Sequence, residues 1–101
     1  MDEITATQSK ERPPTHPGAV LEDMLEDVEI EINDLVERLE VSRQQLYDIR
    51  KEKKPVSPKI AGKLGRFFGN GAGIWLRLQA NYDAYYADRD DALKSIKPYA
   101  A

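Results

Sequence analysis

Apolar residues recur along this chain at the three- and four-residue spacing of amphipathic helices, and breaks in that spacing separate five segments. The first predicted helix runs from about Pro17 to Glu26, and the second from about Glu31 to Leu39. The third runs from about Arg43 to Lys51, the fourth from about Pro58 to Phe68, and the fifth from about Gly73 to Ala87. The pattern therefore predicts an all-α fold.

Each predicted helix has one apolar face, which we expect to be buried in a shared core. In the first, second and fourth segments the apolar positions follow the helical repeat over at least two turns. The expected core consists of Leu21, Met24, Leu25, Val28, Ile32, Leu35, Val36, Leu39, Leu46, Ile49, Ile60, Ala61, Leu64, Phe67 and Phe68.

The fifth segment carries more aromatic surface than a four-helix core needs to cover. Part of this surface completes the core of the monomer, and part of it suits a homodimer interface, where aromatic residues are enriched. The predicted dimerisation residues are Trp75, Leu78, Gln79, Tyr82, Tyr85 and Tyr86.

Two short sequences predict where helices begin. Ser42 and Gln45 have the Ser-x-x-Gln spacing of a capping box, and only three residues separate the second helix from the third. Two short helices joined in this way form a helix-turn-helix unit, whose second helix enters the major groove of DNA. Ser57 followed by Pro58 marks the start of the fourth helix. The glycines of residues 69–73 lack the flanking elements of a phosphate loop and indicate a turn.

The polar face of the third segment is the candidate DNA-reading surface. Arg43 and Gln44 can each bond two atoms of a base edge, while Tyr47 suits a thymine methyl group or a phosphate. Asp48 repels phosphates unless it accepts from a cytosine amine or pairs with Arg50 or with Lys51. An ordinary solvated polar face is the alternative. The predicted DNA-binding residues are Ser42, Arg43, Gln44, Tyr47, Arg50, Lys51, Lys53, Lys54, Ser57 and Lys59.

The net charge of −3 averages two blocks of opposite sign. Residues 17–41 contain nine acids and one base, a net charge of −8, whereas residues 42–67 contain eight bases and two acids, a net charge of +6. The basic block begins at the predicted reading helix and suits contact with phosphates. The acidic block is repelled by DNA and suits a basic protein partner.

The composition excludes several classes of protein. The chain of 101 residues has no cysteine, and therefore no disulfide or thiolate metal site, and His16 is its only histidine. We expect no catalytic residue, no metal and no cofactor, and we expect His16 to pack or cap beside Pro17. No apolar run is long enough to span a membrane and the first residues form no secretory signal, so we expect a cytoplasmic protein.

Several motifs together resemble the HigA-type antitoxins, the addiction-module antidotes within the XRE (Cro-like) helix-turn-helix superfamily. These motifs cover about residues 16 to 86, and the segment around Trp75 is the most specific of them. They are His16-Pro17-Gly18, Val41-Ser42, Ser57-Pro58, Arg66-Phe67-Phe68-Gly69 and Trp75-Leu76-x-Leu78-Gln79-x-x-Tyr82-Asp83.

The resemblance implies five helices, a homodimer, and binding to a palindromic double-stranded operator in the protein's own promoter. It also implies neutralisation of a basic, RelE-like ribonuclease toxin. We expect residues 1–15 to form a flexible arm, residues 16–87 the helix-turn-helix domain with its dimerisation helix, and residues 88–101 a tail.

Two residues depart from the family pattern. Glu40 stands where a glycine is common, and Ile32 stands where many relatives place a glutamine that touches phosphate. We expect both departures to weaken operator affinity, so that DNA binding is sensitive to salt or needs the dimer or the toxin complex. Two other functions therefore stay open: a stand-alone XRE-type regulator without a toxin, and a protein-binding module or antitoxin whose DNA binding is weak or lost.

Overall fold

The structure, a computed structural model, describes residues 12–99. Every regular secondary-structure element in this range is a helix. The helix-turn-helix unit is α3 (Ile32–Leu39) followed by α4 (Arg43–Arg50). The remaining elements are α2 (Pro17–Glu26), α5 (Pro58–Phe68), α6 (Ala72–Asp88) and the short 3-10 helix η1 (Asp91–Leu93). The predicted all-α fold is confirmed, and every predicted α-helix boundary lies within one residue of its observed position.

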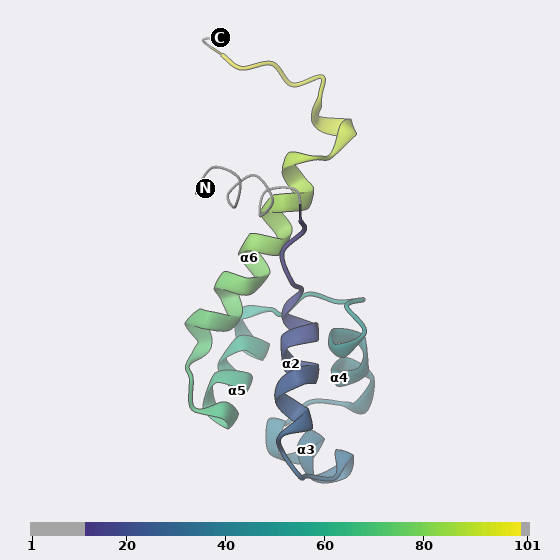
Figure 1. Ribbon diagram of the computed structural model, residues 1–101, viewed down its shortest axis with the longest axis vertical. Coiled ribbons are helices and arrows are strands. Elements are labelled where there is room, and N and C mark those ends of the chain that lie inside the picture. The colour runs from purple at the N-terminus through teal and green to yellow at the C-terminus, as the bar shows by residue number, and fades with distance from the viewer. Residues whose placement is uncertain (1–11, 100–101) are drawn as a thin grey trace, which may run out of the picture.

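The helices form a small bundle from which the end of α6 projects (Figure 1). Helix α2 packs against both α4 and α6, while α3 packs against α4 and α5. Helix α6 lies along α5, and its last turns continue past the bundle toward η1 and the C-terminal end. The bundle therefore presents α4 on one side, and the last turns of α6 extend beyond the other described helices (Figure 1).

The core lies where these helices meet. Its buried apolar residues come from all five α-helices and from the loop before α5. They are Leu21, Leu35, Leu39, Leu46, Ile49, Val56, Ile60, Ala61, Leu64 and Trp75.

The predicted core is largely confirmed, except at Val28, which lines an open groove after α2, and at Ile32. Met24, Leu25, Val36, Phe67 and Phe68 are half-buried against the core, as their places on the apolar faces indicate.

Ile32 was expected to point inward, but 36% of it is exposed. It is the first residue of α3, and its side chain lies beside α4 at the edge of the bundle, where none of the other described elements covers it.

The beginning of α2 is fixed by two neighbouring residues. The His16 Nδ1 accepts a hydrogen bond from the Gly18 backbone N–H at 2.8 Å, so His16 caps the helix as expected. A Cβ atom on Gly18 would lie 1.8 Å from the carbonyl oxygen of Ile49. Only a glycine therefore lets α2 approach the end of α4 this closely.

Glu40 ends α3 with φ 56° and ψ 48°, the left-handed conformation that glycine adopts most easily. The backbone shape expected of the turn is therefore present without the glycine. Lys63 of α5 donates to the Glu40 carbonyl oxygen at 2.5 Å and holds the turn against the bundle.

The predicted terminal segments are described only in part. Residues 1–11 of the predicted arm and residues 100–101 of the predicted tail lie outside the described residues. Residues 12–16 have no regular secondary structure and lead into α2, and residues 88–99 include the end of α6 and η1. Among residues 12–99, no helix combines the length and the apolar character needed to cross a membrane.

Candidate nucleic-acid interface

The start of α4 is held by a complete capping box. The Ser42 Oγ accepts from the Gln45 backbone N–H at 3.0 Å, and the Gln45 Oε1 accepts from the Ser42 backbone N–H at 2.9 Å. This reciprocal pair satisfies two backbone donors that the first turn of a helix leaves without partners. The first turn of α4 is therefore ordered without help from a ligand.

One face of α4 is buried and the other is open. Leu46 and Ile49 are 2% and 4% exposed, and they fix the orientation of the helix against α2 and α3. Arg43, Gln44 and Tyr47 are exposed on the other sides. Those three predicted base-reading residues thus share the outer surface of a short, well-anchored helix.

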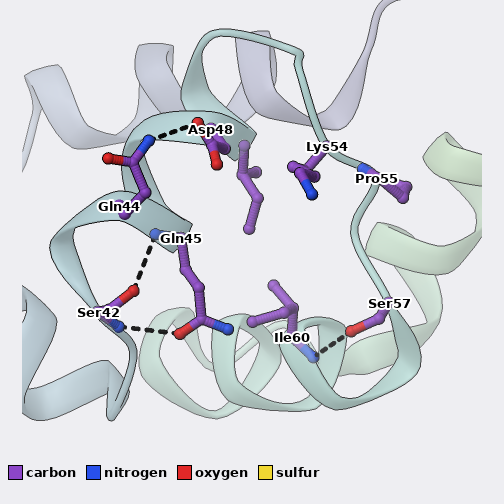
Figure 2. A pocket seen from close by; sticks show the side chains of 9 residues that line it. Ser42, Gln44, Gln45, Asp48, Lys54, Pro55, Ser57 and Ile60 are labelled. Atoms are coloured by element: carbon purple, nitrogen blue, oxygen red, sulfur yellow. Dashed lines mark hydrogen bonds between the residues drawn. The ribbon is translucent and has the colours of Figure 1, made fainter.

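A groove of about 320 Å³ separates α4 from the start of α5 (Figure 2). The side chains of α4 lie on one wall, while the loop before α5 and its first turn form the other. The Gln44 Nε2 donates to the Asp48 Oδ1 at 2.8 Å across one turn of α4. The lining residues are Ser42, Gln44, Gln45, Asp48, Ile49, Lys54, Pro55, Ser57 and Ile60.

The Asp48 carboxylate has a partner that the sequence interpretation did not consider. Arg50, Lys51 and a cytosine amine were the candidate partners, and within the protein the carboxylate accepts from the Gln44 Nε2. Residues four apart on a helix share a face, whereas residues two or three apart are displaced around it by a larger angle. The helical spacing alone therefore favours Gln44 over Arg50.

Sequence reasoning missed Asn33. The Asn33 Oδ1 accepts a hydrogen bond from the Arg43 Nη2, which joins the start of α3 to the start of α4. The family comparison had placed Ile32 at the point where α3 meets DNA, yet the polar side chain beside α4 belongs to the next residue. The sequence signal that could have identified this contact is the amide side chain of Asn33 in the first turn of α3.

Two lysines surround the ring of Tyr47. The Lys53 Nζ lies 5.2 Å and the Lys51 Nζ lies 5.9 Å from the ring centroid, within the range of cation–π contacts. These contacts bring two predicted phosphate-binding charges to one predicted base-reading residue. The arrangement favours the phosphate role for Tyr47 over the thymine methyl.

Arg50 is engaged within the protein. Its Nε lies 2.5 Å from the Glu22 Oε1 and its Nη2 lies 3.1 Å from the Glu22 Oε2, so the guanidinium bridges α4 and α2. The hydrogen bond from Arg50 is the largest cause that lowers the pKa of the Glu22 carboxyl. The geometry makes Arg50 a link between helices and separates it from the outward-facing members of the predicted set.

The first turn of α5 forms the far side of the groove. The Ser57 Oγ accepts from the Ile60 backbone N–H at 3.3 Å, which leaves its own O–H free to donate. Lys54 and Lys59 are exposed on either side of Ser57. This helix start offers positive charge and donors in the arrangement that suits a phosphate.

The predicted dimerisation residues of α6 divide into two groups. Trp75 and Gln79 are 1% and 7% exposed within the single chain, so they belong to the monomer core and that part of the prediction is corrected. The Trp75 Nε1 donates to the Asn70 Oδ1 at 3.1 Å, and the Gln79 Oε1 accepts from the Val56 backbone N–H at 2.7 Å. Both polar groups are satisfied inside the monomer. Leu78 is half-buried against the same core.

The tyrosines lie further along α6. The Tyr82 ring packs edge-on against His16 with centroids 4.7 Å apart, and the Tyr82 and Tyr86 ring centroids are 4.9 Å apart. Burial is the largest cause that raises the pKa of the Tyr82 hydroxyl. Tyr85 is half-buried and 48% of Tyr86 is exposed. These three rings, which we call the tyrosine surface, are the part of the prediction that remains open.

Similar proteins place the chain in a family. Virulence-associated protein A of Dichelobacter nodosus is 35% identical over 95 residues, which span 92% of this chain and 84% of that protein. No protein-family profile matches the chain. A Pseudomonas aeruginosa protein solved in complex with its operator DNA is 35% identical, with a TM-score of 0.70, and the match covers 89% of this chain and 98% of that one.

The antitoxin HigA of Pseudomonas aeruginosa, solved with the higBA promoter, is 31% identical. Its TM-score is 0.73, and the match covers 87% of this chain and 99% of that one. The similarity extends over the capped α4, the start of α5 and α6, and it agrees with the resemblance drawn from the motifs. The chain therefore belongs to the HigA-like antitoxins of the XRE-type helix-turn-helix superfamily.

Proposed function

We propose that this protein is the antitoxin of a toxin–antitoxin module and, as a homodimer, represses its own promoter by binding an operator. The observation that carries the proposal is the capped α4, which exposes Arg43 and Gln44 beside a groove bounded by the start of α5. A helix anchored by its buried face and open at its N-terminal half has the form that enters a major groove.

The roles of the side chains follow from their positions. Arg43 and Gln44 read base edges, because they project from the first turn of α4 and carry groups that bond two atoms of a base. The lysines around Tyr47, together with Lys54, Ser57 and Lys59, hold phosphates on the two sides of the groove. Two relatives solved with operator or promoter DNA support the binding of operator DNA by this fold.

The test uses fluorescence anisotropy with DNA from upstream of the protein's own gene and a scrambled duplex of equal length. We expect the wild type to prefer the upstream DNA, and Arg43→Ala with Gln44→Ala to bind both duplexes equally. Lys94→Ala is the matched control, because Lys94 pairs with Asp91 far from α4. An unchanged preference in the double variant would remove Arg43 and Gln44 from the readout.

The homodimer is proposed from the tyrosine surface. Tyr82, Tyr85 and Tyr86 lie on the half of α6 that projects from the bundle, and aromatic rings are enriched at the centres of interfaces. Two copies joined there would carry two α4 helices to successive major grooves, about one turn of DNA apart.

The toxin partner is proposed from charge. Acidic side chains of the loop before α3 and of α3 itself line a shallow groove of about 390 Å³ together with Val28, Ile30 and Arg38. These acids are Glu29, Glu31, Asp34 and Glu37. A basic, RelE-like ribonuclease offers the opposite charge, which favours association and steers it.

The toxin proposal is tested by co-expression with the gene next to that of the antitoxin. We expect a small basic protein to co-purify with the wild type and to be lost when Glu31 and Asp34 are changed to lysine. If no neighbouring gene product binds, the chain is a stand-alone regulator and the operator assignment is unaffected.

A further inference from the structure

We propose that Asp48 restricts Gln44 to reading adenine, by occupying one of the two N–H donors of the Gln44 amide. The inference rests on the proposed operator binding and deepens it, because it names the base that one side chain reads. It starts from the contact between the Gln44 Nε2 and the Asp48 Oδ1, 2.8 Å apart on the outer face of α4.

This hydrogen bond fixes which way the amide of Gln44 points. A carboxylate is an acceptor only, so the opposite amide orientation would place two acceptor oxygens against each other. The Gln44 Oε1 therefore faces away from Asp48, and Figure 2 shows the Gln44 nitrogen on the side of Asp48. The surface left for a base is one oxygen acceptor and one remaining N–H donor.

That pair of groups complements adenine and conflicts with guanine. The major-groove edge of adenine presents an N6 donor and an N7 acceptor, which match the oxygen and the free N–H of Gln44. Guanine presents two acceptors, O6 and N7, so a glutamine contacts both only by donating both of its N–H groups. Because Asp48 already accepts from one of these N–H groups, Gln44 cannot contact both acceptors of guanine.

The surroundings keep Asp48 available for this role. The Lys54 side chain lines the same groove, but no ion pair joins it to Asp48 in the described part of the chain. The backbone carbonyl of Asp48, and not its carboxylate, accepts from the N–H groups of Lys53 and Lys54. A change of the Asp48 side chain therefore leaves the turn after α4 intact.

The test is selection of bound sequences from a randomised duplex library, with the full-length wild type and three variants. We expect the wild type to prefer adenine over guanine by about tenfold or more at one position of each half-site, the scale of a bidentate contact. Gln44→Ala should abolish the preference at that position and leave the other positions unchanged.

Two Asp48 variants test whether an acceptor-only side chain at this position restricts Gln44. With Asp48→Ala the second N–H of Gln44 is free, so the preference for adenine over guanine at that position should fall to about twofold or less. Asp48→Glu keeps an acceptor-only carboxylate four residues after Gln44 and should retain the adenine preference. Thermal unfolding of each variant confirms that α4 is formed.

Other outcomes would overturn the inference. If Asp48→Ala keeps the wild-type preference, Asp48 does not determine how Gln44 reads DNA, and operator binding stands without it. If Asp48→Glu loses the preference together with Asp48→Ala, an acceptor at this place on α4 is not what restricts Gln44, and the inference fails. If the wild type enriches no sequence at all, the proposed operator binding fails, and this inference fails with it.

Discussion

His16 connects three parts of the molecule through one imidazole ring. Its Nδ1 caps α2 at Gly18, and its ring packs against Tyr82 of α6. Glu52 of the loop after α4 and Asp83 of α6 act on it electrostatically. Burial lowers the pKa of His16 more than these two carboxylates raise it. The folded state therefore favours the neutral ring, whose Nδ1 lone pair the cap requires.

The first prediction concerns the pH dependence of stability. Because the pKa of His16 is lower in the folded state, its contribution is fully present above the unfolded value of about 6.5 and is lost as the pH falls through the folded value. We expect the free energy of unfolding to decrease between pH 7.5 and pH 5 in urea denaturation. His16→Asn keeps a cap without this titration and should show a shallower decrease. Equal slopes for the two proteins would show that His16 does not control this pH dependence.

The second prediction concerns the turn between α3 and α4. Glu40→Gly relieves the left-handed backbone at φ 56° and should raise the free energy of unfolding by up to about 1 kcal/mol. Glu37→Gly is the matched control, because Glu37 is exposed inside α3 and a glycine there should cost about 1 kcal/mol. Thermal and urea unfolding measure both changes. Destabilisation by Glu40→Gly would mean that the Glu40 side chain stabilises the turn.

At the scale of elements, a buried amide ties α6 to the loop before α5. The Gln79 Oε1 accepts from the Val56 backbone N–H at 2.7 Å, and the Gln79 Nε2 donates to the Asp83 Oδ1 at 2.9 Å. Val56 is itself buried, so its N–H has no access to water in place of this bond. The loop that carries Lys54 and Ser57 into the groove is thus positioned by a side chain of α6.

The third prediction follows from this contact. Gln79→Leu leaves the Val56 N–H buried and unpaired, which should lower the free energy of unfolding by about 1–3 kcal/mol. Asp83→Asn keeps an acceptor for the Gln79 amide and should change the free energy of unfolding little. Urea denaturation at several protein concentrations measures the effect. If the decrease in the free energy of unfolding depends on protein concentration, Gln79 contributes to the dimer interface, as the sequence interpretation predicted.

The helices were predictable because their signals are local. The apolar spacing, Ser42 with Gln45, and Ser57 with Pro58 all act within one or two turns of chain, and each lies where the sequence predicted it. The contact between Arg50 and Glu22 joins residues that lie 28 positions apart in the sequence. The contact between Gln79 and Val56 joins residues that lie 23 positions apart. No periodicity encodes such contacts, so the sequence assigned Arg50 and Gln79 to outer surfaces.

The whole molecule places its two proposed binding surfaces at different positions. The groove between α4 and α5 lies on the bundle, while the tyrosine surface lies on the part of α6 that projects from it (Figure 1). A change at one surface can therefore leave the other intact, which makes dimerisation and DNA reading separately testable.

The fourth prediction tests the dimer. Tyr85→Lys with Tyr86→Lys places two charges on the tyrosine surface and should convert a dimer to a monomer in sedimentation analysis. Helical content should be retained, because Tyr86 is largely exposed and Tyr85 is half-buried. Affinity for upstream DNA should fall because one α4 then binds alone. A variant that remains dimeric would place the interface elsewhere.

The central claim, that two copies of α4 read one operator, is tested most directly by hydroxyl-radical footprinting on the protein's own upstream DNA. We predict two protected patches related by a two-fold axis, with centres about 10 base pairs apart. The patches should vanish together in the variant with Arg43→Ala and Gln44→Ala. A folded, dimeric wild type that leaves the DNA uniformly cleaved would contradict the claim and would make the acidic groove the main functional surface.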